Sequence, residues 1–269
     1  MNADTTIVVP CYNEATRLPV DAFRAFVAAE PRVRFLFVDD GSTDETPHVL
    51  SRLTTTEPDR VQTIVQRVNR GKAEAVRVGM LSAFANGGRY AGYWDADLAT
   101  PLSEILRFID VLEAQPDRDI CFGARVQLLG REIDRTPVRH YVGRLFATAA
   151  SVALRLPVYD TQCGAKLFRV SPAMRALFVE RFLGRWTFDV EIIARLMQQC
   201  ARERRPASDI IYELPLEEWR DVDGSKVHPL DFFAALIELG RIRRLYGSNP
   251  VLTSQSEISV EYGHRADIH

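Results

Sequence analysis

The sequence predicts an α/β fold in which a mostly parallel sheet is flanked by helices, and three observations support this class. Short apolar runs in the first 124 residues alternate with amphipathic patterns of helical length, an alternation typical of βαβ units. The chain of 269 residues is 46% hydrophobic and 26% charged, the composition of a globular protein long enough to bury a sizeable core. Polar clusters follow the apolar runs directly, and parallel sheets bind ligands at that edge.

Five strands are predicted in the first half. Each is an apolar run bounded by polar or turn-forming residues, and helical spacing fills the interval before the next run. Capping side chains and early acids begin two of the helices, near 42–45 and near 100–104. The predicted strands span 5–10, 33–39, 61–67, 90–94 and 119–124, and the predicted helices span 20–30, 44–56, 72–85 and 102–114.

The second half has a less regular pattern. Residues 125–137 are polar and rich in arginine, which predicts a mobile loop, and residues from 248 onward have no periodicity and are expected to fray. A loop at 160–169 runs into a strand, and 220–228 is a polar loop. The remaining predicted elements are helices at 138–156, 188–202 and 229–246 and a strand at 209–217.

Charge and cysteine content exclude several classes of protein. Lysine and arginine number 34 against 36 acids, for a net charge of −2, whereas a general nucleic-acid binder needs a basic excess. Residues 1–6 lack the features of a signal peptide, and no uncharged apolar run approaches a membrane span. We therefore expect a cytoplasmic protein that at most lies on the membrane surface. The scattered cysteines predict reduced thiols rather than zinc ligands or disulfides; they are Cys11, Cys121, Cys163 and Cys200.

Four polar motifs come directly after predicted strands, at 10–14, 39–42, 69–72 and 95–97. In a parallel sheet these segments gather at one edge. Asp95 and Asp97 are spaced so that both carboxylates can reach one divalent cation, and hard oxygen ligands suit Mg²⁺ or Mn²⁺ bridging a diphosphate. The plainer alternative is a pair of acids that caps the next helix.

Asp39 and Asp40 end a buried strand. One of them can accept a hydrogen bond from a nucleobase N–H or a ribose hydroxyl, and the other can cap the DDGST turn. Lys72 and Arg70 lie at a helix start, where an anion is already favoured.

Together the motifs PCYNE, VDDGSTDET, NRGKAEAVRVG and DADLATP resemble the nucleotide-sugar domain of family 2 glycosyltransferases, which have the GT-A fold. The resemblance covers about residues 4–230. Three later segments, DTQCGAKLF, RWTFDVE and WRDVDGSK, are similar to the dolichyl-phosphate β-glucosyltransferase branch. Ala99 stands where related polyprenyl-phosphate mannosyltransferases have Gln, which favours the glucosyl branch or a bacterial undecaprenyl-phosphate counterpart.

The resemblance implies a division of the chain. It predicts a GT-A domain over 1–228, with a nucleotide-sugar half at 4–124 and an acceptor half at 125–228. A C-terminal helix and a flexible tail follow at 229–269.

The resemblance also implies residue roles. Asp95 and Asp97 hold the metal, with Asp97 the stronger candidate, and Asp97, Arg125, Asp189 and Lys226 form the predicted catalytic set. Arg125 and Arg139 bind the acceptor phosphate, and Lys226 with Arg220 closes over the diphosphate. Pro10, Tyr12, Glu14 and Asp40 frame the nucleoside, and Lys72, Ala96, Gln162 and Lys166 complete the predicted substrate contacts.

The chain contains only three lysines, Lys72, Lys166 and Lys226, and all three fall in these motifs. An ammonium and a guanidinium differ in geometry at a phosphate site, so their retention is consistent with phosphate contacts. With only three residues, chance explains the placement as well.

An acceptor phosphate needs little from the protein besides positive charge, because a phosphate monoester is mostly dianionic at pH 7. Residues 125–155 carry six arginines against Glu132 and Asp134. A hydroxyl acceptor needs a carboxylate base instead, and Asp189 falls where hydroxyl-using relatives place it. Asp189 can equally be a structural acid that orients Arg185 or Lys166.

The resulting hypothesis is an inverting, metal-assisted transfer of glucose from UDP-glucose to a polyprenyl phosphate such as dolichyl or undecaprenyl phosphate. The alternatives are a family 2 enzyme with a hydroxyl acceptor and a nucleotide-sugar binding protein without turnover. Helices 138–156 and 229–246 are apolar with basic residues nearby, as interfacial helices are, which predicts peripheral attachment to the cytoplasmic membrane face. Alternatively, both helices simply pack on the sheet.

Overall fold

A computed structural model describes residues 3–134, 137–222 and 229–247 of the chain. Within these residues a seven-stranded sheet has the order β3-β2-β1-β4-β7-β5-β8, and only β7 runs antiparallel to its neighbours. The α/β class with a mostly parallel sheet is confirmed. The strands are β1 (Thr5–Cys11), β2 (Val33–Asp39), β3 (Val61–Val65), β4 (Tyr90–Tyr93), β5 (Ile120–Ala124), β7 (Lys166–Arg169) and β8 (Ile211–Pro215).

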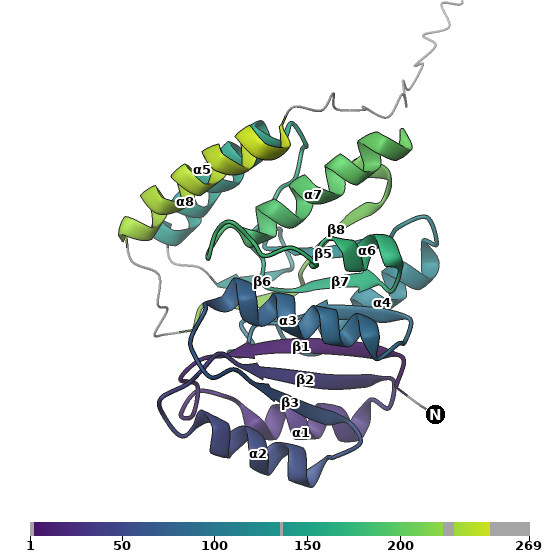
Figure 1. Ribbon diagram of the computed structural model, residues 1–269, viewed down its shortest axis with the longest axis vertical. Coiled ribbons are helices and arrows are strands. Elements are labelled where there is room, and N and C mark those ends of the chain that lie inside the picture. The colour runs from purple at the N-terminus through teal and green to yellow at the C-terminus, as the bar shows by residue number, and fades with distance from the viewer. Residues whose placement is uncertain (1–2, 135–136, 223–228, 248–269) are drawn as a thin grey trace, which may run out of the picture.

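Helices cover both faces of the sheet (Figure 1). Because successive side chains of a strand point to opposite faces, Ile7 and Val9 of β1 join one core and Val8 joins the other. The first core is closed by α1 (Val20–Ala29), α2 (Thr46–Thr56) and α4 (Glu104–Ala114). The second is closed by α3 (Lys72–Ala85), α5 (Pro137–Leu154), α6 (Pro172–Ala176), α7 (Phe188–Glu203) and α8 (Pro229–Tyr246).

The prediction of a loop throughout 125–137 is wrong at its centre. Residues 132–134 form a short strand, β6 (Glu132–Asp134), which pairs in parallel with β9 (Glu218–Arg220), a strand that was not predicted and whose last residue was assigned to the loop at 220–228. The helix α6 was missed as well, although Ser171 caps it and Pro172 occupies its first position, two signals that the sequence displays. A 3₁₀ turn at Ala207–Asp209 precedes β8.

Helix boundaries shifted where side chains close turns. The predicted start at Asp44 moves to Thr46 because the Asp44 carboxylate accepts hydrogen bonds from the Thr46 amide (2.9 Å) and hydroxyl (2.5 Å). These bonds hold 42–45 as a turn ahead of the helix.

α5 and α8 lie side by side and pack on α7 (Figure 1). One side of each helix is buried, through Phe146 and Ala150 of α5 and Leu239 and Ile242 of α8. Among the described residues, no helix combines the length and the apolar character that crossing a membrane requires. The predicted flexible tail, 248–269, and Lys226 lie outside the described residues. The boundaries of the predicted domain and its halves stay a prediction.

Candidate active site

The four polar motifs meet at the carboxyl edge of the parallel strands. β1 pairs with both β2 and β4 in parallel, so their ends lie next to one another. The Asp40 amide donates to the Cys11 carbonyl at 2.8 Å, and the Asn13 amide donates to the Ser42 hydroxyl at 2.9 Å. The Lys72 ammonium forms an ion pair with Asp95. The expectation that one edge collects these motifs is confirmed.

The loop after β1 is fixed by side chains from the loop after β2. Asn13 has a positive φ of 52°, and its side-chain oxygen accepts from the Thr43 amide at 2.9 Å. Glu14 is nearly buried, and its carboxylate is held by the Arg17 guanidinium at 2.6–3.0 Å. The hydrogen bond to Glu14 raises the pKa of Arg17, and the charge of Asp97 contributes to the same shift. Arg17 therefore lies close enough to the Asp-x-Asp motif for the charge of Asp97 to act on it.

The adjacent acids Asp39 and Asp40 have different surroundings. The two Asp40 oxygens accept from the Arg70 and Gly71 amides at 2.9 and 2.7 Å. Burial raises the pKa of Asp40, although these bonds oppose the shift. Asp39 uses one oxygen to accept from Ser42, while its Oδ2 is buried without a hydrogen-bond partner in the described residues.

These contacts assign the two acids different tasks. Asp40 closes the loop that carries Lys72, and the Asp39 Oδ2 is the oxygen left to accept a hydrogen bond from a ligand. Gly41 makes this geometry possible, because it has a φ of 68° and a Cβ there would lie 2.6 Å from the Asn69 amide nitrogen.

Asp95 and Asp97 form the acidic centre of the site. The Asp95 side chain is 33% exposed, and Asp97 accepts from the Ala99 amide at 3.1 Å. Burial raises the pKa of Asp97, and the charge of Asp95 raises it further. Burial lowers the pKa of Lys72, but the charges of the Asp95 and Asp189 carboxylates outweigh this effect, so the pKa of Lys72 is raised.

The donor set fits a divalent cation whose coordination is completed by a ligand. The Asp95 and Asp97 carboxylates supply hard oxygen ligands, and the charge of Asp95 raises the pKa of Asp97. The described residues hold no group of three or more histidine, cysteine or acidic side chains placed to bind a metal alone. Diphosphate oxygens complete such a site in enzymes that bind Mg²⁺ through one or two carboxylates.

The DTQCGAK segment forms the wall beside this centre. Gly164 lies so close to Asp95 that a Cβ at that position would overlap the carboxylate. Hydrogen bonds from Lys166 hold the rest of the segment. The Thr161 and Cys163 carbonyls accept from the Lys166 ammonium at 3.1 and 2.6 Å.

Asp189, in the first turn of α7, completes this buried network. Its Oδ1 accepts from the Lys166 ammonium at 2.6 Å and from the Tyr93 hydroxyl at 2.5 Å. Burial and the charge of Asp189 raise the pKa of Tyr93. Lys166 has no exposed surface, and its bonds orient Asp189 and the wall; its predicted substrate contact stays a prediction.

Arg125, predicted to bind the acceptor phosphate, forms a buried ion pair with Asp160. Two guanidinium nitrogens of Arg125 donate to the carboxylate at 2.6 and 2.8 Å, and the Arg125 amide donates at 3.1 Å. Burial alone would raise the pKa of Asp160, but the adjacent guanidinium holds it well below its usual range. Glu213 accepts from the Tyr159 and Asp160 amides and fixes the turn.

The remaining predicted site residues have different surroundings. Gln162, a predicted substrate contact, has a buried side-chain nitrogen without a partner in the described residues. Arg220, predicted to close over the diphosphate, is 71% exposed and lies 3.6 Å from Glu132. Arg139 belongs to α5, but its side chain lies outside the described residues, as does Lys226. Pro10 in β1 and Tyr12 after it are half-buried, and Ala96 is buried.

Comparison with known proteins decides the family. The family model described as "Glycosyl transferase family 2" matches residues 6–176. The chain belongs to family 2 of the glycosyltransferases. It is 33% identical to a dolichyl-phosphate beta-glucosyltransferase from Drosophila melanogaster over 261 residues, covering 88% of this chain and 72% of the relative. The corresponding Mus musculus protein is 30% identical, with 88% and 72% covered.

Solved structures share the fold of this glycosyltransferase. Glucosyl-3-phosphoglycerate synthase from Mycobacterium tuberculosis, in complex with uridine diphosphate, has a TM-score of 0.62 at 18% identity, with 92% of this chain and 81% of that chain covered. A mannosyltransferase from Pyrobaculum calidifontis, in complex with GDP-Man and Mn²⁺, has a TM-score of 0.59 at 17% identity, with 93% and 66% covered. At these identities the likeness establishes the GT-A fold.

Several residues of the glycosyltransferase site were missed by sequence reasoning. Tyr93 and Asp160 support candidate residues, and Gly164 shapes the wall beside Asp95. Asp160 and Gly164 lie inside the quoted DTQCGAKLF motif, which was the available signal, whereas Tyr93 lies at the end of a predicted strand and outside the quoted motifs. Glu238 of α8 gave no signal, because it lies in a helix of ordinary appearance more than 50 residues from the loop it contacts.

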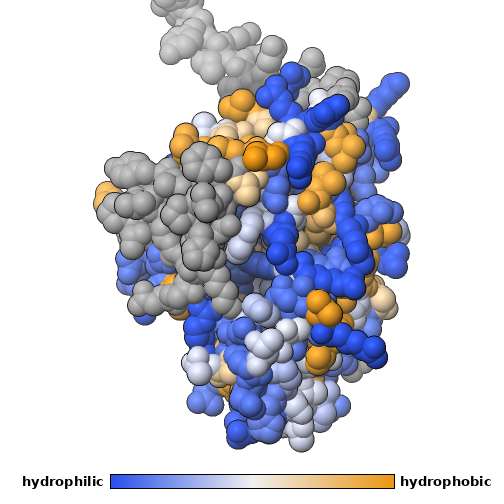
Figure 2. Space-filling model, turned by 60° about the vertical axis from the view of Figure 1, so that its left-hand side comes forward, coloured by the Kyte–Doolittle hydropathy of each residue, from blue (hydrophilic) through white to orange (hydrophobic). Residues whose placement is uncertain are grey.

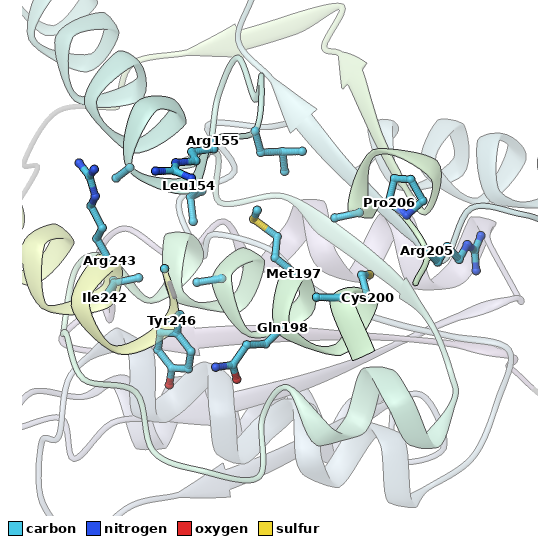
Figure 3. A pocket seen from close by; sticks show the side chains of 16 residues that line it. Leu154, Arg155, Met197, Gln198, Cys200, Arg205, Pro206, Ile242, Arg243 and Tyr246 are labelled. Carbon is cyan, nitrogen blue, oxygen red and sulfur yellow. The ribbon is translucent and has the colours of Figure 1, made fainter. Parts of the chain in front are cut away.

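A separate cavity of about 60 Å³ lies between the C-terminal ends of α5, α7 and α8 (Figure 3). Apolar side chains such as Leu154, Met197 and Ile242 line it, together with Arg155 and Arg243. Asp189 is in the first turn of α7 and the cavity is at the other end, so the cavity is remote from the acidic centre. None of the candidate site residues lines it.

Proposed function

We propose that this glycosyltransferase moves glucose from UDP-glucose to a polyprenyl phosphate, with inversion and with a divalent metal. The observation that carries the proposal is the contact between Gly164 and Asp95. DTQCGAK belongs to the segments that resemble the dolichyl-phosphate glucosyltransferase branch, and it forms the wall of the donor site. The names of the relatives support the same donor and acceptor classes.

In this proposal the donor is held by the first half of the chain. The Asp39 Oδ2 accepts the imino N–H of uracil, and Asp40 keeps the loop of Lys72 in place. The Lys72 ammonium, which pairs with Asp95 in this structure, would pair with the diphosphate of a bound donor. Helix α3 begins at Lys72, so its N-terminus also favours the anion.

Asp95 and Asp97 would hold Mg²⁺ or Mn²⁺. When bound, the metal neutralises charge on the departing diphosphate. Solved structures that share the fold and contain Mn²⁺ support a divalent ion of this kind.

The acceptor needs no general base, because its phosphate is already anionic. Arg125 and Arg139 would supply positive charge to it, Lys226 with Arg220 would close over the donor diphosphate, and the Gln162 amide would add a hydrogen bond. The Asp189 carboxylate accepts from Lys166 and Tyr93, an arrangement that suits a fixed negative charge better than a proton acceptor for an attacking hydroxyl.

The lipid acceptor implies attachment to the cytoplasmic face of a membrane. The outer sides of α5 and α8 expose Leu145, Val152, Ile237 and Leu245. Figure 2 shows hydrophobic residues in the upper part of the molecule, where α5 and α8 lie, among strongly hydrophilic ones. Apolar residues beside arginines are typical of helices that lie in a membrane interface.

The test is release of UDP from UDP-glucose with Mg²⁺, measured with and without a short-chain polyprenyl phosphate. Release that needs the lipid, and that EDTA and Asp97→Ala abolish, supports the acceptor and the metal together. UDP-glucose binding without release would contradict the lipid acceptor. Release with hydroxyl acceptors, lost in Asp189→Asn while the protein stays folded, would establish the alternative route. Binding without release under any acceptor would indicate a binding protein.

A further inference from the structure

A loop from the second half of the chain reaches the donor edge of the sheet. Residues 184–187 precede α7, and the Arg185 guanidinium donates to the Asn69 side-chain oxygen at 3.2 Å. A Cβ on Gly71 would lie 2.9 Å from the Arg185 Nε. The charge of Arg185 also lowers the pKa of Asp40, although burial, the larger effect, raises it. The Arg185 side chain therefore packs against the turn at residues 69–71, directly before Lys72.

The Arg185 guanidinium has capacity to bind a ligand. The side chain is exposed, and within the described residues its guanidinium makes the one hydrogen bond to Asn69 and no ion pair with an acid. Guanidinium groups bind phosphates through two parallel hydrogen bonds. A diphosphate anchored at Lys72 and the start of α3 would be next to this group.

Glu238 of α8 fixes the same loop from the other side. Its Oε1 accepts from the Arg185 amide at 3.3 Å, and its Oε2 accepts from the Thr187 hydroxyl at 2.7 Å. Gly184 has no room for a side chain, because a Cβ there would overlap the Glu238 carboxylate. A carboxylate at this point also complements the N-terminus of α7, where Thr187 occupies the N-cap position.

We propose that Arg185 is a donor-binding residue that contacts the diphosphate of the nucleotide sugar, and that Glu238 is the positioning residue that sets it in place. The donor site is then completed by α8, which lies outside the segment matched by the family model. The inference rests on the proposed nucleotide-sugar donor.

A double variant distinguishes a positioning role of Glu238 from a purely structural one. If Glu238 acts through Arg185, its loss matters only while Arg185 is present. If Glu238 only stabilises the loop, its loss is independent of Arg185, and the effects of the two substitutions add.

The experiment is calorimetric titration of UDP with Mn²⁺ into the wild type, Arg185→Ala, Glu238→Ala and the double variant. Binding of uridine, which lacks phosphates, is followed by NMR. We expect Kd for UDP to rise at least tenfold in Arg185→Ala and about three- to fivefold in Glu238→Ala, with the double variant equal to Arg185→Ala. Uridine binding stays within twofold of wild type in every variant.

Two further variants serve as controls. The affinity of Glu238→Gln, which keeps one acceptor oxygen, falls between those of the wild type and Glu238→Ala, and this variant replaces Glu238→Ala if Glu238→Ala does not fold. Glu203→Ala, at the far exposed end of α7, is the matched control and binds as wild type.

Each contrary result is distinct. Wild-type affinity for UDP in Arg185→Ala overturns the inference, and so does an equal loss of uridine and UDP binding. Additive effects in the double variant overturn the role of Glu238. A wild type that binds no UDP overturns the proposed donor itself, and the inference falls with it.

Discussion

Replacing Asp39 by Asn should weaken donor binding without weakening the fold. The Asp39 Oδ2 is buried and has no partner in the described residues, while its other oxygen accepts from Ser42. An Asn side chain can keep the bonds to Ser42, but it places an NH₂ group where the free oxygen was. A ligand N–H that needs an acceptor then meets a donor.

The magnitude follows from the bond that is lost. A hydrogen bond to a charged group contributes about 1.5–3 kcal/mol, which corresponds to a rise of about 10- to 150-fold in Kd for UDP. The free protein loses no partner and no longer buries an incompletely satisfied charge, so its free energy of unfolding should stay equal or rise by about 1 kcal/mol.

The neighbouring carboxylate provides the matched control. Asp40 accepts from two backbone amides, and Asp40→Asn keeps only one acceptor oxygen. That variant should lose about 1.5–3 kcal/mol of unfolding free energy. Calorimetric UDP titration and urea unfolding measure both quantities. The reasoning is refuted if Asp39→Asn binds UDP within threefold of wild type, or if Asp39→Asn loses more stability than Asp40→Asn.

Three other predictions follow from the same contacts. Asp160→Asn should cost about 3 kcal/mol at pH 7, because it breaks a buried pair, whereas the exposed Glu132→Gln should cost under about 0.5 kcal/mol. Because the folded-state pKa of Asp160 is lowered, the ionised carboxylate contributes its full stabilisation above the unfolded pKa of about 3.9, and this stabilisation is lost as the pH falls from there towards the lower folded-state pKa. Urea unfolding of the wild type and Asp160→Asn at pH 7 and near pH 3 checks this, and an equal loss of unfolding free energy at both pH values would contradict it. Lys72→Gln should free Asp95, so Mn²⁺ should bind the nucleotide-free protein several-fold more tightly by calorimetry while UDP binds more weakly; unchanged Mn²⁺ affinity would argue against the ion pair. Burial raises the pKa of Cys163 to about 11, so a thiol reagent at pH 8 should modify it only as urea unfolds the protein, and rapid labelling in native buffer would exclude the buried placement.

The sequence predicted the first half of the fold well because its central strands are buried on both faces. Residues 35–38 of β2 form an apolar run for this reason, and parallel pairing then placed the polar motifs at one edge. The ion pair between Lys72 and Asp95 follows from the same topology.

Other features depend on long-range contacts that no local pattern records. β6 has three residues of which only Ile133 is buried, and its partner β9 lies about 85 residues later. The different tasks of Asp39 and Asp40 depend on which backbone amides face each carboxylate. Lysine is rarely buried, so residue type alone did not predict that Lys166, in a motif expected to contact phosphate, is completely buried.

The place of β5 in the sheet has a consequence for how the chain assembles. Within the residues that the structure describes, β5 pairs with β7 and β8 alone, and both strands come after it in the chain. On the ribosome, residues 120–124 therefore emerge as an apolar strand with no strand available to pair with, and they wait until about 45 further residues have been synthesised. A fragment that ends at residue 124 would keep that strand exposed, so the nucleotide-sugar half should aggregate rather than fold as an independent piece.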